Sequence, residues 1–294
     1  MDSYQAPIKD IMFALTKLAN LNQFSEKTNN KDLSSDNIKM ILDEAGKFAT
    51  EKLDNINQKG DREGVTLENG IVRMPDCFIK AYKEFVKNQW FTVIGEKKYG
   101  GQDMPISVLV AINEIWESAN MSFAVNNMLT QGAIELIQEH GSEKQKTTNL
   151  PKLITGEWSG TMNLTEPHAG SDLSTLKTKA EKSNSNKYLI KGTKIYITHG
   201  DQDMSDNIIH LVLAKIPNSP PGVKGISLFL VPKYYNNDQG KLIKNDIKVL
   251  SIEHRLGHNA SPTCVLSFGE NGGALGELIG EAKFGLKAMW TMMN

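Results

Sequence analysis

Apolar residues in the first half of the chain recur at steps of three and four, the spacing of a helix that buries one face. One such run follows Pro7. A second follows Ser34 and Ser35, whose hydroxyls suit a helix N-cap, and a third follows Pro75, which suits the first turn of a helix. We therefore predict an all-α domain over residues 1–157.

The later part of this domain is predicted to hold two more helices. Pro105 opens one that runs toward Ser118, and another spans Met121–His140 and ends before Gly141. The polar, glycine-containing stretch Asn57–Gly70 carries no apolar period, so we expect it to interrupt the helical pattern.

From about Trp158 the pattern changes to short runs rich in β-branched residues, which turn residues separate. No helical pattern lies between successive runs, which disfavours a parallel βαβ sheet and favours an antiparallel barrel or sandwich over residues 158–280. The fold class is then α+β. The runs are KYLIKGTKIYITHG, NIIHLVLAKI, GISLFLVPKY and PTCVLSF.

Helical periodicity returns over residues 281–294. A helix from Lys283 to Asn294 would carry apolar side chains with nothing in the chain to pack on. We therefore expect these residues to be the start of a C-terminal helical bundle that is truncated here.

Composition and charge exclude some classes of function. The 294 residues are 39% hydrophobic and carry a formal net charge of -1, which gives no general attraction to nucleic acid or to an anionic membrane. The N-terminus lacks the basic and apolar regions of a signal peptide, and no apolar run is long enough to span a bilayer. A cytoplasmic protein is the expectation.

The cysteine and histidine positions do not indicate a metal site or a disulfide framework. Cys77 and Cys264 lie far apart, without CxxC spacing, so we expect both to be small buried hydrophobic residues. His254 and His258 are four residues apart but flank a glycine, and this spacing forms a metal site only on a continuous helix with further ligands.

The densest group of polar residues with possible chemistry is the segment from Met162 to Asp172, MNLTEPHAGSD. Leu164 and Thr165 end a predicted strand, and the chain then turns through Gly170. Such a loop presents hydroxyls and backbone N–H groups to a polar ring or a pyrophosphate. The alternative is a plain turn at a strand end, which Ser, Asp and Gly favour in any case.

A second group lies in the segment KGTKIYITHG, residues 191–200. Tyr196 offers an aromatic face and Thr198 a hydroxyl, which together suit a flat heterocycle that is stacked on one side and hydrogen-bonded at its edge. The alternative is again structural, because Tyr and Thr are common in strands.

These segments resemble the acyl-CoA dehydrogenases. TEPHAGSD after MNL resembles the first signature of that family, and KGTKIYITHG followed by Asp201 is similar to its flavin-facing strand. KKYGGQDMP, EHRLGHNASPTCVLSF and GELIGEAKFGLKAMWTMMN resemble further family segments, in family order, from Trp90 to Asn294. The opening YQAPIKDIMFAL and the end AMWTMMN resemble the branch that contains 3-methylmercaptopropionyl-CoA dehydrogenase, which implies extra helices within about residues 1–33.

The resemblance implies FAD as cofactor and assigns roles by position in the motifs. Thr165 would bond the pyrimidine edge of the flavin, Ser171 would lie near the pyrophosphate and the acyl-CoA substrate, Tyr196 would pack beside the isoalloxazine, and Thr198 would approach N5. Hydrogen-bond donors at those atoms stabilise the electrons that arrive on reduction. The full set of implied cofactor-binding residues is Met162, Leu164, Thr165, Gly170, Ser171, Tyr196, Ile197 and Thr198.

The implied reaction is α,β-desaturation of an acyl-CoA thioester, with an electron-transfer flavoprotein as acceptor and a homo-oligomer as the full-length form. The family places its catalytic glutamate in the C-terminal bundle, so no catalytic residue is assigned here and this part alone is expected to be inactive. Glu166 is expected to order its loop by accepting backbone hydrogen bonds, and His168 and His199 to face solvent. The alternative function is a non-catalytic binding or assembly module that pairs with another dehydrogenase subunit.

Overall fold

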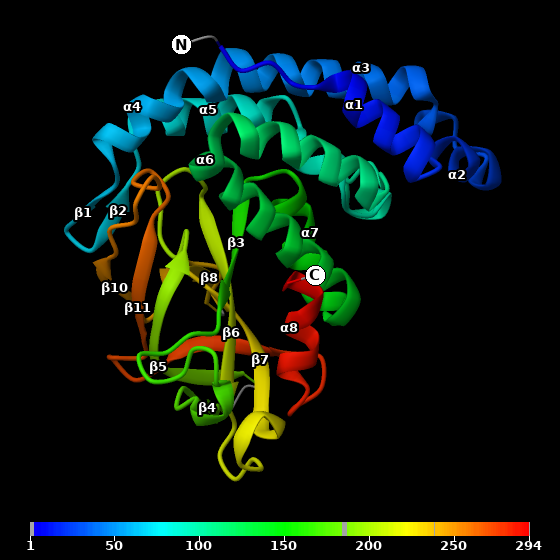
Figure 1. The fold of residues 1–294 in the computed structure, drawn as a ribbon. Helices are drawn as coiled ribbons and strands as arrows, with labels where there is room; N and C mark the ends of the chain where they lie inside the picture. The colour runs from blue at the N-terminus through cyan, green and yellow to red at the C-terminus, as the bar shows by residue number, and fades with distance from the viewer. Residues whose placement is uncertain (1–2, 184–186, 238, 294) are drawn as a thin grey trace.

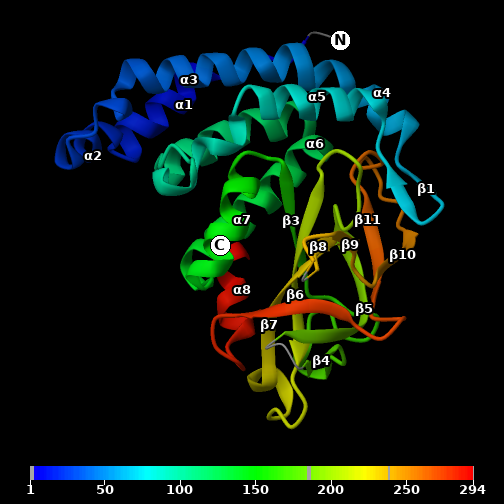
Figure 2. The same ribbon diagram turned by 180° about the vertical axis from the view of Figure 1, so that it is seen from behind.

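The computed structural model describes residues 3–183, 187–237 and 239–293. A layer of helices lies over a β part, and the last helix returns to lie beside both (Figure 1; Figure 2 from behind). The α+β fold class predicted from the sequence is confirmed. None of the described helices is both long and apolar enough to cross a bilayer.

Three helices begin where the sequence predicts them. The Ser34 hydroxyl accepts a hydrogen bond from the N–H of Asn37, as an N-cap does, and Pro7 and Pro75 immediately precede helices. The α-helices of the first part are α1 (Ile8–Phe13), α2 (Leu21–Thr28), α3 (Ser35–Phe48), α4 (Asn55–Glu63), α5 (Asp76–Lys87), α6 (Ile106–His140) and α7 (Glu143–Ile154). Short π-helical segments, Ala14–Leu18 and Ala49–Asp54, extend α1 and α3.

The prediction for Asn57–Gly70 is wrong in its first half. Helix α4 covers residues 55–63, and a small hairpin of β1 (Thr66–Glu68) and β2 (Ile71–Arg73) follows. Gly60 of α4 lies against the ring of Phe78, and a Cβ at Gly60 would come within 2.1 Å of that ring. Helix α4 therefore contacts Phe78 through the backbone at Gly60 and not through an apolar side chain. The sequence of this helix shows no apolar period for that reason.

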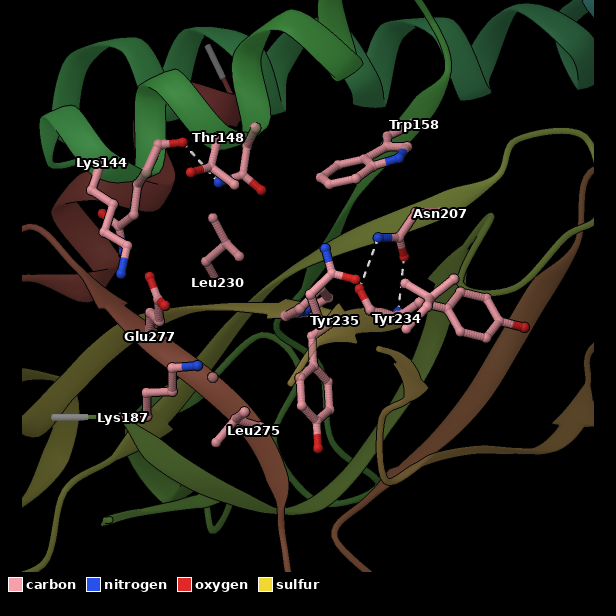
Figure 3. A pocket seen from close by; sticks show the side chains of 16 residues that line it. Lys144, Thr148, Trp158, Lys187, Asn207, Leu230, Tyr234, Tyr235, Leu275 and Glu277 are labelled. Atoms are coloured by element: carbon pink, nitrogen blue, oxygen red, sulfur yellow. Dashed lines mark hydrogen bonds between the residues drawn. The ribbon is translucent and has the colours of Figure 1, made fainter. Parts of the chain in front are cut away.

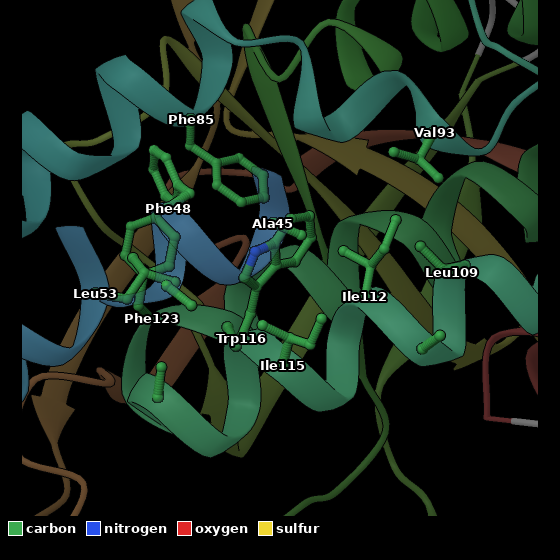
Figure 4. Packing of buried hydrophobic residues seen from close by; sticks show 14 of the residues in the cluster. Ala45, Phe48, Leu53, Phe85, Val93, Leu109, Ile112, Ile115, Trp116 and Phe123 are labelled. Carbon is green, nitrogen blue, oxygen red and sulfur yellow. The ribbon is translucent and has the colours of Figure 1, made fainter. Parts of the chain in front are cut away.

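The two predicted helices after Pro105 are one element, α6, with a kink between them. Asn120 has non-helical angles (φ -159°, ψ 90°), its side-chain amide donates to the carbonyl of Leu53, and its side-chain carbonyl accepts from the N–H of Phe123. Helix α6 contributes to two hydrophobic cores, and the change of core comes after the kink. Residues up to Ala124 pack among the helices, as Figure 4 shows around Trp116 and Phe85, and residues from Ala133 on pack against the β part.

The β part is one main sheet in the order β10-β11-β5-β12-β7-β6-β3, with β4 paired to β5 and β6. Its pairs are antiparallel, as predicted, except for β3 with β6 and a single bridge of β4 with β6, which are parallel. The strands of the sheet are β3 (Trp158–Asn163), β4 (Lys179–Lys182), β5 (Tyr188–Thr198), β6 (Asn207–Lys215), β7 (Ile226–Pro232), β10 (Ile247–Ile252), β11 (Thr263–Phe268) and β12 (Ala274–Ile279). A small hairpin of β8 (Tyr234–Asn236) and β9 (Leu242–Lys244) lies beside it.

The C-terminal helix α8 (Gly285–Met293) is present, but the expectation that it has nothing to pack on is wrong. Met289 is fully buried, and Met292 lies against Gly132 of α6. Gly285 sits directly on the backbone of Ser227 in β7, so close that a Cβ would come within 2.2 Å of the Ser227 carbonyl carbon. Helix α8 is therefore seated between α6 and the sheet.

Candidate functional site

A cavity of about 480 Å³ lies where β3, β5, α6 and α8 meet, a volume typical of ligand sites. All eight residues that the sequence singled out for a cofactor line it, so two segments separated by about 20 residues are brought to one place. The lining comprises Leu129, Met162, Leu164, Thr165, Gly170, Ser171, Asp172, Leu173, Tyr196, Ile197, Thr198, Val223, Leu286, Trp290 and Met293.

Thr165 and Thr198 converge because the end of β3 runs beside the end of β5. The N–H of Ile195 donates to the carbonyl of Thr165 at 2.9 Å, and the Thr161 hydroxyl donates to the carbonyl of Thr198 at 2.8 Å. Within the described chain, the hydroxyls of Thr165, Ser171 and Thr198 form no hydrogen bond to protein. They are available to a bound ligand.

Tyr196 faces the cavity because of a β-bulge. Ile195 and Tyr196 together lie opposite a single residue of β11, Val265, and Tyr196 has a φ of 58°. A non-glycine residue in this left-handed region is strained by about 1–2 kcal/mol. Its side chain is 62% exposed, so burial of the ring does not compensate for that strain. Bulges and strained residues of this kind gather at functional sites.

The loop that follows Thr165 is held by a buried carboxylate, as predicted for Glu166. Glu166 accepts hydrogen bonds from the backbone N–H groups of Lys177 (2.7 Å) and Thr178 (3.0 Å), and from the Thr178 hydroxyl. The Lys194 ammonium lies 2.9 Å from the same carboxylate, and both side chains are buried.

The electrostatics of this pair keep both partners charged. Burial alone would raise the pKa of Glu166, but the Lys194 ammonium and the hydrogen bonds from Thr178 and Lys177 outweigh it and hold that pKa below its ordinary value. Burial lowers the pKa of Lys194 to about 8, against the opposing effect of Glu166, so Lys194 remains protonated at neutral pH.

For Asp172, the alternative interpretation of the segment as a plain turn is correct. Its carboxylate accepts from the N–H and the hydroxyl of Ser174, both at 2.8 Å, which is an Asx-turn. Hydrogen bonds from Ser174 hold the pKa of Asp172 below its ordinary value. The carboxylate therefore shapes the loop, while the neighbouring Gly170 and Ser171 remain exposed in the cavity wall.

Sequence reasoning missed the helical wall of the cavity. Leu129 comes from α6, and Leu286, Trp290 and Met293 come from α8. Trp290 is 49% exposed, unusually open for a tryptophan. In the sequence these residues resemble ordinary core positions of a helix. Their place in the cavity wall becomes visible only in the folded chain, where Trp290 stays half exposed.

The expectation of solvent exposure is right for His168 but wrong for His199. His199 is 1% exposed and has a left-handed φ of 48°, and its Nδ1 atom has no partner within the described residues. Burial lowers the pKa of His199 to about 4, so the ring is neutral at pH 7. Cys264 is buried as expected, whereas Cys77 is only partly buried.

A second cavity, of about 250 Å³, lies between α7 and the strands β7 and β12 (Figure 3). Lys144 and Thr148 reach it from α7, and Glu277 reaches it from β12. Both side-chain atoms of Asn207 are already bonded to the backbone of Tyr234 at 2.9 Å, so this amide holds the β8 strand. The described residues contain no group of three or more His, Cys, Asp or Glu placed to hold a metal ion.

Comparison with known families agrees with the geometry. The family model described as "Acyl-CoA dehydrogenase, N-terminal domain" matches residues 35–157. The model described as "Acyl-CoA dehydrogenase, middle domain" matches residues 161–270. The two matches follow each other in order along the chain and include every predicted cofactor-binding residue.

Similar proteins extend the match over the whole chain. A 3-methylmercaptopropionyl-CoA dehydrogenase of Ruegeria pomeroyi is 44% identical over 99% of this chain and 49% of its own length. A butyryl-CoA dehydrogenase of Syntrophomonas wolfei is 36% identical over 100% of this chain and 50% of its own. The chain thus spans about half the length of the curated relatives it matches.

The fold is shared with solved structures. An acyl-CoA dehydrogenase from Bacillus anthracis, crystallised with FAD, superposes with a TM-score of 0.70 at 24% identity, over 90% of this chain and 40% of that one. Two family models in order, extended sequence identity and a common fold lead to one conclusion. The chain belongs to the acyl-CoA dehydrogenase family.

Proposed function

We propose that this chain forms the flavin-binding half of an FAD-dependent acyl-CoA dehydrogenase, which desaturates an acyl-CoA thioester. The observation that carries the proposal is the convergence of Thr165 and Thr198 on one cavity, where neither hydroxyl has a hydrogen-bond partner among the residues that the structure describes. Free donors beside an exposed aromatic ring, Tyr196, and apolar walls suit a flat redox heterocycle.

In the proposed reaction, a carboxylate takes the α-proton of the substrate and the β-hydrogen leaves as hydride. FAD, when bound, supplies the hydride acceptor. Thr165 and Thr198 would donate hydrogen bonds to the ring and stabilise the added electrons, and Tyr196 would pack on it. Ser171, exposed at the rim, would contact the cofactor pyrophosphate and the acyl-CoA.

The proposal places the catalytic base outside these residues. Asp172 is the only carboxylate among the described residues that line the cavity, and it is bonded to Ser174. Exposed apolar residues on α6, among them Val110 and Met128, offer a surface for further helices that would complete the site. We propose a cytoplasmic homo-oligomer that passes electrons to an electron-transfer flavoprotein, with this half alone inactive.

Titration of the chain with FAD, followed by quenching of flavin fluorescence, tests the proposal. Thr165→Val and Thr198→Val are each expected to weaken binding about 10-fold, since one net hydrogen bond is worth about 1.4 kcal/mol here. Thr193→Val, in the same strand but outside the cavity, is the matched control and should bind as the unmodified chain does.

Two results would contradict the proposal. Failure of the unmodified, folded chain to bind FAD at any accessible concentration would remove its basis. Equal affinities for the Thr165, Thr198 and Thr193 variants would show that FAD binds elsewhere. Rapid bleaching of flavin absorbance on adding butyryl-CoA would keep the enzyme assignment but refute the inactivity of this half.

A further inference from the structure

The three residues that lead out of β3 are each tied to β5 at its bulge. The Lys194 ammonium donates to the carbonyl of Leu164 at 2.8 Å, and the N–H of Ile195 donates to the carbonyl of Thr165 at 2.9 Å. The same ammonium then pairs with Glu166 at 2.9 Å. A single lysine therefore contacts the chain on both sides of Thr165.

Glu166 extends the connection to the far end of its loop. Its two oxygens accept the backbone N–H groups of Lys177 and Thr178, eleven and twelve residues later. The cavity-lining residues of this loop, among them Gly170 and Ser171, lie between the two anchored ends. The carboxylate thus closes the loop, and the lysine fixes the closed loop to β5.

A buried ion pair is a poor source of net stability. Removing two charges from water costs several kcal/mol per ion, and apolar residues of similar volume often stabilise a fold as well or better. The side chains of Lys194 and Glu166 are only 0% and 2% exposed, so both ions are removed from water and incur such a cost. The pair is better explained by the need to hold the loop after Thr165 in one position than by a gain in the free energy of folding.

We infer that Lys194 and Glu166 are positioning residues of the flavin site, a buried pair that holds Thr165 and the loop 166–178 in register with Tyr196 and Thr198. The inference rests on the proposed function for its ligand. Neither side chain lines the cavity, so both act through the residues that do. Without the pair, the loop would lose its fixed distance from the bulge, and the two free hydroxyls would no longer face one ligand together.

The variant Lys194→Met combined with Glu166→Gln tests the inference without leaving an unpaired buried charge. Two controls match it. Val231→Ala removes buried volume from β7, away from the cavity, and lowers the melting temperature of the same β part. Lys191→Met with Glu181→Gln removes an exposed ion pair from the same strand as Lys194.

Hydrogen exchange of the cofactor-free chain is the first readout. The amides of residues 164–178 are expected to exchange at least 10-fold faster in the double variant, while those of α6 keep their rates. Both controls should leave loop exchange as it is in the unmodified chain. An unchanged loop in the double variant overturns the inference, and so does an equal acceleration in Val231→Ala.

FAD affinity is the second readout, measured by fluorescence quenching on the same proteins. The dissociation constant is expected to rise at least 10-fold in the Lys194/Glu166 variant and to stay unchanged in both controls. If the dissociation constant rose as much in Val231→Ala as in the double variant, general loss of stability would explain the effect, and the inference would be overturned. If the unmodified chain binds no FAD, the proposed function fails, and hydrogen exchange alone decides whether the pair positions the loop.

Discussion

His199 gives the chain a pH-dependent stability that can be assigned to one ring. Its pKa is lowered to about 4 by burial, whereas an unfolded histidine titrates near 6.5. A group whose pKa is depressed in the folded state contributes stability that is present above the unfolded pKa and lost as pH falls through the folded pKa. The stability from His199 is therefore complete above about pH 6.5 and declines toward pH 4.

The magnitude follows from the difference between a folded pKa of about 4 and an unfolded pKa near 6.5. The full loss is about 3 kcal/mol, of which about 2 kcal/mol has occurred by pH 5. His199→Asn removes the titrating ring. Asparagine also tolerates the left-handed backbone found at this position, so the substitution adds little strain.

Urea unfolding at pH 7.5 and pH 5.0 measures the difference. Between these pH values, the free energy of unfolding of the unmodified chain should fall by about 2 kcal/mol more than that of His199→Asn. His254→Asn, which removes an exposed histidine, should retain the full loss. An identical pH dependence for His199→Asn and the unmodified chain would refute a buried, neutral His199.

Three further substitutions test other features. Tyr196→Gly should stabilise the cofactor-free chain by up to about 1 kcal/mol in thermal melting, since glycine adopts a φ of 58° without strain. The same substitution should weaken FAD binding in a titration, because it removes the aromatic ring from the cavity. Gly285→Ala should destabilise by about 1–3 kcal/mol in urea unfolding, because the new methyl group meets the Ser227 backbone. Lys194→Met alone should cost about 3–5 kcal/mol in the same assay, because it leaves Glu166 buried without its ionic partner.

The sequence predicts those parts of the fold whose signals are local. Ser34 and Pro75 mark helix starts by their own capping chemistry, and the alternating runs mark strands whose side chains lie on two faces. Helix α4 gives no such signal, because its contact with Phe78 is made by Gly60. The docking of α8 depends on Gly285 in the same way, so a pattern of apolar side chains cannot reveal it.

The residues of the candidate site likewise fall into those that the local sequence predicts and those that it does not. Thr165 and Thr198 could be selected because the segments that carry them resemble the family's flavin-binding motifs, whereas a hydroxyl at a strand end is by itself also common in plain turns and strands. Leu129 and Trp290 could not, because helical apolar residues are indistinguishable from core until their neighbours are known. The burial of His199 could not be predicted either, because it depends on neighbours that are distant in the sequence, and a loop position in the family's motif carries no sign of them.

Helix α6 takes part in two separate regions of packing. Its residues up to Ala124, on both sides of the kink at Asn120, pack with the aromatic cluster around Trp116, and Phe123 contacts Phe85 directly. Farther along the helix, Leu129 lines the cavity and Gly132 contacts Met292 of α8. A substitution at Leu129 or Gly132 can therefore reshape the cavity without removing a contact from the aromatic cluster.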